Sequence, residues 1–121
     1  VTAPVTTEEE ENSFILDDRI FVKYRDLMVK IYLQDILYAE ADRNYCKVFT
    51  KDREYLMTLS LKAFENTLNA ENFLRIHRSY IVNLTKVDSL SDHCEYVNIG
   101  QKHLSVSRSF KEELMRRLKV I

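Results

Sequence analysis

The chain has 121 residues, of which 45% are hydrophobic, and its formal net charge is −1. This length suits one domain, and this apolar content can build a core, so the composition excludes a wholly disordered chain. No apolar run approaches the ~20 residues that a membrane-spanning helix needs.

The first 18 residues differ in charge from the rest of the chain. They hold six acidic residues and no Lys or Arg, which leaves 18 basic and 13 acidic residues, a net charge of +5, for residues 19–121. We therefore expect an acidic linker, or the end of an upstream domain, over residues 1–18, followed by one folded domain over residues 19–121. A moderately basic domain is compatible with nucleic-acid binding but does not establish it.

Short strands dominate the first half of this domain. Apolar residues alternate with polar ones, so that Leu27, Val29 and Ile31 share one strand face. Arg25-Asp26 and Asp42-Arg43-Asn44 have the polar composition of tight turns between strands. The predicted strands in this half cover residues 20–24, 27–33, 36–41, 45–50 and 54–59.

A helix is predicted after the fifth strand. Ser60 is a good N-cap, because its hydroxyl can accept a hydrogen bond from an early helix amide. Leu61, Phe64 and Leu68 fall on one helical face. Asn69 is the predicted end of this helix.

Strands resume in the second half, and a helix ends the chain. Gly100-Gln101 has the glycine-first chemistry of a two-residue type II′ hairpin turn. Ser109 and Glu112 have the spacing of a capping box, which predicts that the last helix begins at Ser109. The predicted strands here cover residues 73–77, 80–82, 86–90, 94–99 and 102–106. The predicted fold class is mainly β, with small antiparallel β-sheets flanked by two helices.

The most informative segment for function is residues 73–83. It places Arg75, His77, Arg78 and Ser79 within five residues between two apolar stretches, which predicts a polar corner with Arg78 and Ser79 at its tip. Arg can fork onto the O6 and N7 atoms of guanine, and Ser hydroxyls commonly hold phosphates. The alternative for Arg78 is an ordinary surface arginine in a turn. For His77 we expect a structural role, half-buried and hydrogen-bonded to the backbone.

Two further polar clusters are candidates for the same chemistry. In residues 105–111 a strand ends, three serines alternate around its end, and a helix begins. Helix N-termini bind phosphate readily, and Arg108 precedes this one closely enough to reach a base edge. The alternative is helix capping alone. The polar bend at residues 42–47 is, taken by itself, an ordinary hairpin loop.

Enzymatic chemistry is poorly supported. His77, His93 and His103 lack metal-ligand spacing, and Cys46 and Cys94 form no CxxC motif, so we expect free thiols and no metal site. One glycine cannot build a phosphate-cradling loop, and no nucleophile-elbow signature is present. We therefore predict a protein that is not an enzyme and has no cofactor.

Four segments taken together resemble the LytTR family of bacterial DNA-binding domains. The third of them, with Phe, Arg, His, Arg, Ser, Tyr and Asn in register, carries the hallmark of the family. The resemblance covers residues 19–121. The matching segments are residues 35–45, 59–62, 73–83 and 104–108.

The resemblance implies small antiparallel sheets flanked by helices and DNA reading through loops that enter successive major grooves. It places Arg78 and Arg108 at base-reading positions, and it maps a third loop onto residues 44–47. Cys46 stands there in place of a larger polar reader, so the resemblance leaves Asn44 or Lys47 to substitute for it. The residues that match phosphate-facing positions are Ser79, Lys47, Ser105, Ser107 and Ser109. His77 and Asn83 match framework positions.

Family members usually follow a phosphorylatable receiver domain that is served by a sensor kinase, and some relatives carry a membrane or other sensor instead. The resemblance therefore implies a cytoplasmic transcriptional regulator that binds double-stranded DNA at a repeated site, where two copies can dimerise. The competing hypothesis is a protein-interaction module of the same fold that pairs with a receiver or another regulator. RNA binding is disfavoured, because no aromatic stacking platform is evident.

Overall fold

Over residues 15–121, the fold consists of ten short strands and two helices. The computed structural model describes residues 15–121, so the predicted linker lies outside the described residues except for residues 15–18. The strands are β1 (Arg19–Tyr24), β2 (Leu27–Tyr32), β3 (Ile36–Asp42), β4 (Tyr45–Thr50), β5 (Glu54–Met57), β6 (Phe73–His77), β7 (Tyr80–Asn83), β8 (Ser89–Leu90), β9 (Tyr96–Ile99) and β10 (Lys102–Ser105). The helices are α2 (Leu61–Glu65) and α3 (Arg108–Leu118), with short 3-10 turns η1 (Leu33–Asp35) and η2 (Leu84–Lys86). The predicted mainly β class is confirmed.

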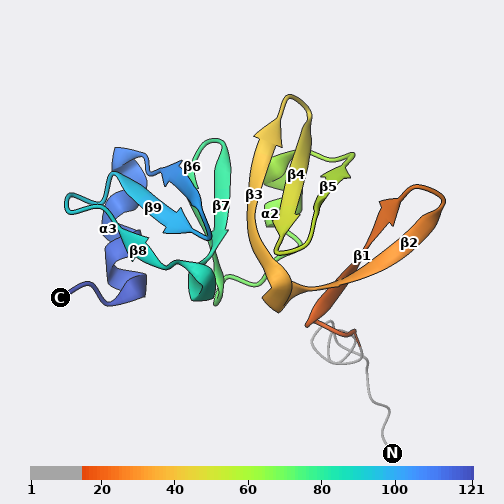
Figure 1. The fold of residues 1–121 in the computed structure, drawn as a ribbon, viewed down its shortest axis with the longest axis horizontal. Helices are drawn as coiled ribbons and strands as arrows, with labels where there is room; N and C mark the ends of the chain where they lie inside the picture. The colour runs from red at the N-terminus through yellow and green to blue at the C-terminus, as the bar shows by residue number, and fades with distance from the viewer. Residues whose placement is uncertain (1–14) are drawn as a thin grey trace, which may run out of the picture.

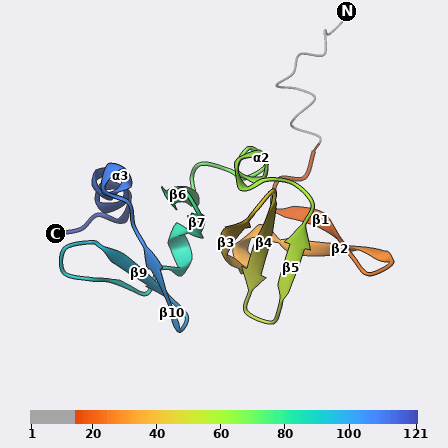
Figure 2. The same cartoon turned by 90° about the horizontal axis from the view of Figure 1, so that it is seen from above.

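The strands form three antiparallel sheets. A five-stranded sheet in the order β5-β4-β3-β7-β6 lies between a two-stranded ribbon, β1-β2, and a three-stranded sheet, β10-β9-β8. Figure 1 shows these units side by side along the long axis, with the ribbon at one end and α3 at the other. The view from above in Figure 2 keeps the same order. The five-stranded sheet is therefore the central unit.

Two hydrophobic cores cover the two faces of this central sheet. Successive strand residues point to opposite faces, so Ile81 joins one core and Val82 the other. The first core takes Phe64 from α2 and Val22 from the ribbon. The second takes Leu114 from α3, together with residues of β9 and β10. Packing on both faces holds the central strands, whose ends carry the polar turns described below.

Helix α2 begins as predicted but ends early. The Ser60 hydroxyl oxygen accepts a hydrogen bond from the Ala63 amide at 3.1 Å, which confirms the N-cap. The helix ends at Glu65, so the predicted end at Asn69 is wrong. The Thr67 hydroxyl donates to a carbonyl of the last helical turn at 2.7 Å, and the chain continues in tight turns. Side chains that bond the nearby backbone compete with helix propagation.

Helix α3 begins two residues earlier than its sequence predicts. Its N-cap is Ser107 and its first residue is Arg108, so the predicted cap at Ser109 is wrong. The Ser107 amide donates to the carbonyl of Ile76 at 2.8 Å, which fixes the helix start against β6. A tertiary hydrogen bond thus overrides the local capping-box pattern, and the Ser107 side chain makes no capping hydrogen bond.

Strand boundaries in the last sheet also differ from the prediction. Lys86 belongs to the 3-10 turn η2, and Cys94 has a φ of +57°, so both β8 and β9 are shorter than expected. The hairpin at Gly100-Gln101 is confirmed, since Ile99 pairs with Lys102 across it. Gly100 has a φ of +61°, and this left-handed conformation suits glycine.

Candidate nucleic-acid interface

The corner between β6 and β7 presents Arg78 and Ser79. His77 pairs with Tyr80, so only these two residues form the turn. The pairing register shifts between Arg75 and His77, which makes a β-bulge just before the corner. The Arg78 side chain is exposed, and Ser79 is half-buried. The polar corner predicted from the sequence is therefore present.

Side chains of the preceding strand brace this corner. The Arg75 guanidinium donates to the carbonyls of His77 at 3.0 Å and Arg78 at 2.6 Å, and it pairs with Glu65 of α2 at 3.0 Å. The His77 Nδ1 atom accepts a hydrogen bond from the Ser79 amide at 3.0 Å. The predicted structural role of His77 is confirmed, and the corner is fixed by charged and polar groups rather than by turn propensity alone.

The bulge joins this corner to the start of α3. A bulge leaves its extra residue unpaired in the ladder, and here the carbonyl of Ile76 is free to accept the hydrogen bond from Ser107. Arg108 and Ser109, which follow, are exposed. The first amides of a helix have no partner within the helix. The α3 start therefore offers a hydroxyl, an arginine and helix amides beside Arg78.

The turn between β3 and β4 adjoins the corner on its other side. Asp42 pairs with Tyr45, so Arg43–Asn44 is a two-residue loop, and both of its residues are exposed. The Ala41 amide donates to the carbonyl of Ser79 at 2.9 Å. This backbone hydrogen bond fixes the β3–β4 turn next to the β6–β7 corner.

We call these three neighbouring segments the loop face: the β3–β4 turn (Arg43–Asn44), the β6–β7 corner (Arg78–Ser79) and the α3 start (Ser107–Ser109). All three lie along the upper edge of the molecule in Figure 1. The structure thus brings to one edge most of the residues that the sequence singles out. Lys47 and Ser105 lie within three residues of the loop face, on β4 and at the end of β10.

Beneath the β3–β4 turn, Cys46 cannot contact a ligand. Its side chain is fully buried, and burial raises the pKa of the thiol to about 11, so it is neutral at physiological pH. Lys47, the next residue, is half-buried, and its Nζ atom lies 4.0 Å from the Asp42 carboxylate. Cys46 and Cys94 are both free thiols, as predicted.

Arg43 is a candidate that the sequence reasoning missed. It stands at the tip of the β3–β4 turn with a φ of +60°. The pairing of Asp42 with Tyr45 makes Arg43 one of two loop residues, and this register would have identified it. The sequence alone predicted a three-residue bend over residues 42–44. Tyr45, at the start of β4, is also exposed.

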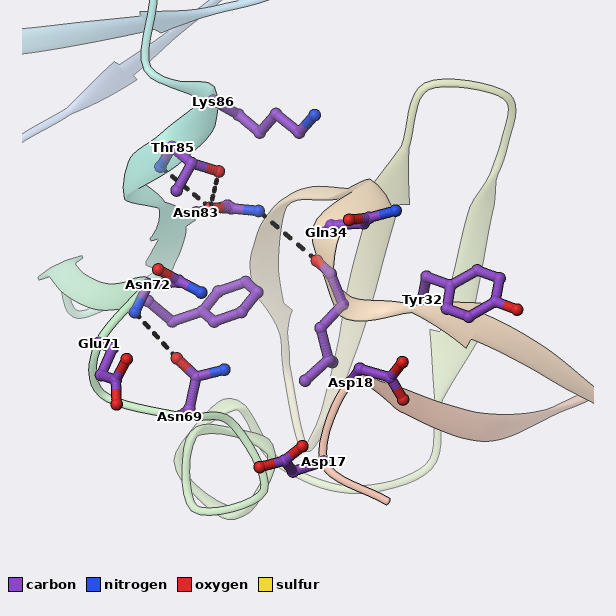
Figure 3. A pocket seen from close by; sticks show the side chains of 12 residues that line it. Asp17, Asp18, Tyr32, Gln34, Asn69, Glu71, Asn72, Asn83, Thr85 and Lys86 are labelled. Carbon is purple, nitrogen blue, oxygen red and sulfur yellow. Dashed lines mark hydrogen bonds between the residues drawn. The ribbon is translucent and has the colours of Figure 1, made fainter.

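A polar hollow of about 730 Å³ lies at the opposite ends of the central strands, and Figure 3 shows it from close by. Its acidic lining residues are Asp17, Asp18 and Glu71, and its only basic one is Lys86. This charge balance disfavours a phosphate, so the hollow is a poor candidate for nucleic acid.

Asn83 reaches from this hollow into the framework. It is buried, and its amide nitrogen donates to the carbonyl of Ile36 at 2.8 Å, at the start of β3. Its amide oxygen accepts hydrogen bonds from the backbone and the hydroxyl of Thr85. The predicted framework role of Asn83 is confirmed, because it ties β7 to β3 at the end remote from the loop face.

Across residues 15–121, His, Cys, Asp and Glu side chains form no group of three that could hold a metal ion. Within the same range, no helix is long and apolar enough to cross a membrane.

Comparison with known proteins identifies the family. The family model of the LytTr DNA-binding domain matches residues 26–119. The heme-containing CO-sensing transcriptional regulator RcoM 2 of Paraburkholderia xenovorans is 35% identical over 108 residues, which cover 85% of this chain and 40% of that protein. The transcriptional regulatory protein YpdB of Escherichia coli K12 is 34% identical over 85 residues, 70% of this chain and 32% of YpdB. The chain thus spans less than half the length of these relatives.

A solved structure has the same fold. The LytTr DNA-binding domain of a putative methyl-accepting/DNA response regulator from Bacillus cereus superposes with a TM-score of 0.72, at 23% identity, over 84% of this chain and 96% of that one. The sensory transduction protein LytT of Bacillus subtilis is 27% identical over 93% of this chain and 48% of its own length. The chain belongs to the LytTR family of DNA-binding domains of transcriptional regulators.

Proposed function

We propose that this domain recognises a specific double-stranded DNA sequence by inserting the loop face into the major groove. In this proposal Arg78, Arg108 and Asn44 contact bases. The residues that contact phosphates are Ser79, Lys47, Ser105, Ser107 and Ser109. The observation that carries the proposal is the pair of backbone hydrogen bonds, Ala41 to Ser79 and Ser107 to Ile76, which hold three polar segments together on one edge.

The chemistry of these segments supports the proposal. Arg78 and Arg108 are exposed. The Arg78 carbonyl accepts a hydrogen bond from Arg75, but within residues 15–121 neither the Arg78 nor the Arg108 guanidinium makes a hydrogen bond or ion pair. An unpaired guanidinium can give its fork of donors to guanine. The net charge of +5 over residues 19–121 favours association with a polyanion.

The relatives are more than twice as long as the segment that this chain matches, which supports a further domain in the whole protein. We propose that residues 1–18 link this domain to a preceding receiver domain, that a sensor kinase phosphorylates the receiver, and that two copies bind a repeated DNA site in the cytoplasm. RcoM 2 is named as a heme-containing CO-sensing regulator. The alternative to a receiver domain is therefore a sensor domain of another kind in front of this domain, and the two should be tested against each other.

The test is selection of bound duplexes from a randomised pool, followed by anisotropy titration with the selected duplex and a scrambled one. We expect Arg78→Ala to weaken binding to the selected duplex about 10- to 100-fold and to change binding to the scrambled duplex little. Lys47→Ala should weaken both and lower the salt dependence by about 0.9 per lost phosphate contact. Lys62→Ala, which removes an exposed cation of α2, is the control and should change neither.

Two results would contradict the proposal. Equal losses on both duplexes for Arg78→Ala would remove its base-reading role. A folded protein that enriches no sequence from the pool would instead favour the protein-interaction module.

A further inference from the structure

The backbone of the β3–β4 turn is unusual at one residue. Arg43 takes the left-handed conformation, with a φ of +60°, although Asn44 beside it is the residue type that tolerates this conformation better. Asp42 and Tyr45 pair directly, so the two-residue loop leaves no freedom to relax Arg43. Residues held in such conformations cluster at functional sites, which is a reason to ask what Arg43 contacts.

The hairpin itself requires a positive φ at the first residue of its two-residue loop, and no partner within residues 15–121 occupies the side chain that this turn presents. The Arg43 side chain is exposed and makes no hydrogen bond, ion pair or aromatic contact there. The neighbouring carboxylate of Asp42 lies near Lys47 instead. Arg43 thus holds its full set of guanidinium donors free at the tip of a hairpin.

The position of this tip is fixed relative to Arg78. Two residues before Arg43, the Ala41 amide is bonded to the carbonyl of Ser79. The hairpin tip and the β6–β7 corner are therefore neighbours, and Figure 1 shows both turns on the same edge. Two neighbouring turns on one edge can contact the same duplex.

The other residues of this loop are poorer candidates for reading a base. Cys46 is fully buried, and Lys47 is half-buried beside Asp42. Asn44 is exposed, but Arg43 projects from the same tip with a longer side chain and a charged donor fork.

We infer that Arg43 is the base-reading side chain of the third loop and that it takes a guanine, through O6 and N7, in the major groove. This inference rests on the proposed function, and it makes Arg43, in place of Asn44, the principal base-contacting residue of this loop. It assigns to this chain a specificity-determining residue that compensates for the buried Cys46.

The chain supplies a matched control. Arg25 occupies the same place in the two-residue turn between β1 and β2, with Tyr24 paired to Leu27 and a φ of +60°. Its guanidinium, however, stacks on the Tyr24 ring at 5.3 Å. Asn accepts the left-handed conformation, so Arg43→Asn and Arg25→Asn remove one charge each from equivalent turns without new backbone strain.

The experiment repeats the selection from a randomised duplex pool with the full chain and both variants. We expect Arg43→Asn to lose a guanine preference of about 10- to 100-fold at one position and to keep the rest of the motif. Arg25→Asn should keep every base preference. Replacing that guanine by 7-deazaguanine, which lacks the N7 acceptor, should weaken binding of the wild-type chain and leave Arg43→Asn unchanged.

Four results would overturn the inference. If Arg43→Asn selects the wild-type motif, or if Asn44→Ala is the variant that loses the guanine, Arg43 is not the reader. If Arg25→Asn loses the same guanine preference, the loss comes from the lower net charge and not from a contact made by Arg43. If the wild-type chain enriches no motif, the proposed function falls as well, which distinguishes the two failures.

Discussion

The β6–β7 corner and the β3–β4 turn present an arginine by different means. At the corner, side chains hold the backbone. The Arg75 guanidinium donates hydrogen bonds to two carbonyls, and His77 accepts one from the amide of Ser79. At the turn, strand pairing and the backbone hydrogen bond from Ala41 to Ser79 hold the hairpin, and the conformation of Arg43 is disfavoured by about 1–2 kcal/mol. The first arrangement depends on half-buried polar groups, and the second depends on hairpin register. The two turns should therefore fail under different substitutions.

The largest effect should come from Asn83, which ties the β6–β7 hairpin to the β3–β4 hairpin. Asn83→Ala leaves the carbonyl of Ile36 and the amide of Thr85 without their buried partner, so we expect a loss of about 3 kcal/mol in the free energy of unfolding, measured with urea. Asn72→Ala changes an exposed asparagine that lines the same hollow and should cost less than about 0.5 kcal/mol. Similar losses for both variants would mean that Asn83 is not the shared tie.

An alkaline titration tests the buried layer beneath the β3–β4 turn. The pKa of the Cys46 thiol is about 11 in the fold against 9.0 ordinarily, so its contribution to stability is complete below pH 9 and is lost as the pH rises through 11. We expect the wild-type chain to lose about 2 kcal/mol more than Cys46→Ala between pH 8 and pH 11, in urea unfolding. Tyr38, whose pKa burial raises to about 12, is common to both chains and cancels. If the free energies of unfolding of the two chains fall in parallel with pH, the Cys46 thiol is in contact with water.

A smaller effect should separate the two turns directly. Arg75→Ala removes the donors to the carbonyls of His77 and Arg78, so we expect binding to the selected duplex to weaken about 10-fold, or ~1.4 kcal/mol, by anisotropy. The base preference at the Arg78 position should relax while that at the Arg43 position persists. Glu65→Gln removes only the ion pair of Arg75 and should have less effect. Loss of preference at both positions would show that the two turns are not independent.

The sequence predicted the corner well because its signals are local. Alternating strands around a short polar run imply a tight turn, and the resemblance separated Arg78 and Ser79 at its tip from the framework residue His77. The structure adds the bracing partners, which include Glu65 from a distant helix. The strand pairs on either side of both turns were also predicted, with boundaries that differ by at most one residue.

The remaining differences come from contacts between distant segments. Ser109 and Glu112 satisfy a capping-box pattern, but the hydrogen bond from Ser107 to Ile76 sets the helix start. That bond uses the carbonyl of Ile76 at the β6 bulge, and no residue type marks the bulge in the sequence. Arg43 was missed for a related reason: the pairing of Asp42 with Tyr45, and not composition, makes it the tip of the turn.

The two cores that cover the central sheet also have a consequence for motion. Strands β3 and β7 are interior strands with hydrogen-bonded neighbours on both sides and a core on each face, so opening them requires disruption of both cores. Regions of this kind exchange their amide hydrogens only in large, rare openings, whereas opening of the β1-β2 ribbon disrupts one core, to which it contributes Val22 and Ile31. The anchor points of the loop face, at Ala41 and Ser79, adjoin the ends of these two slow strands. We therefore expect the β3–β4 turn and the β6–β7 corner, which we propose to contact DNA, to share the long lifetime of the central sheet although they are turns.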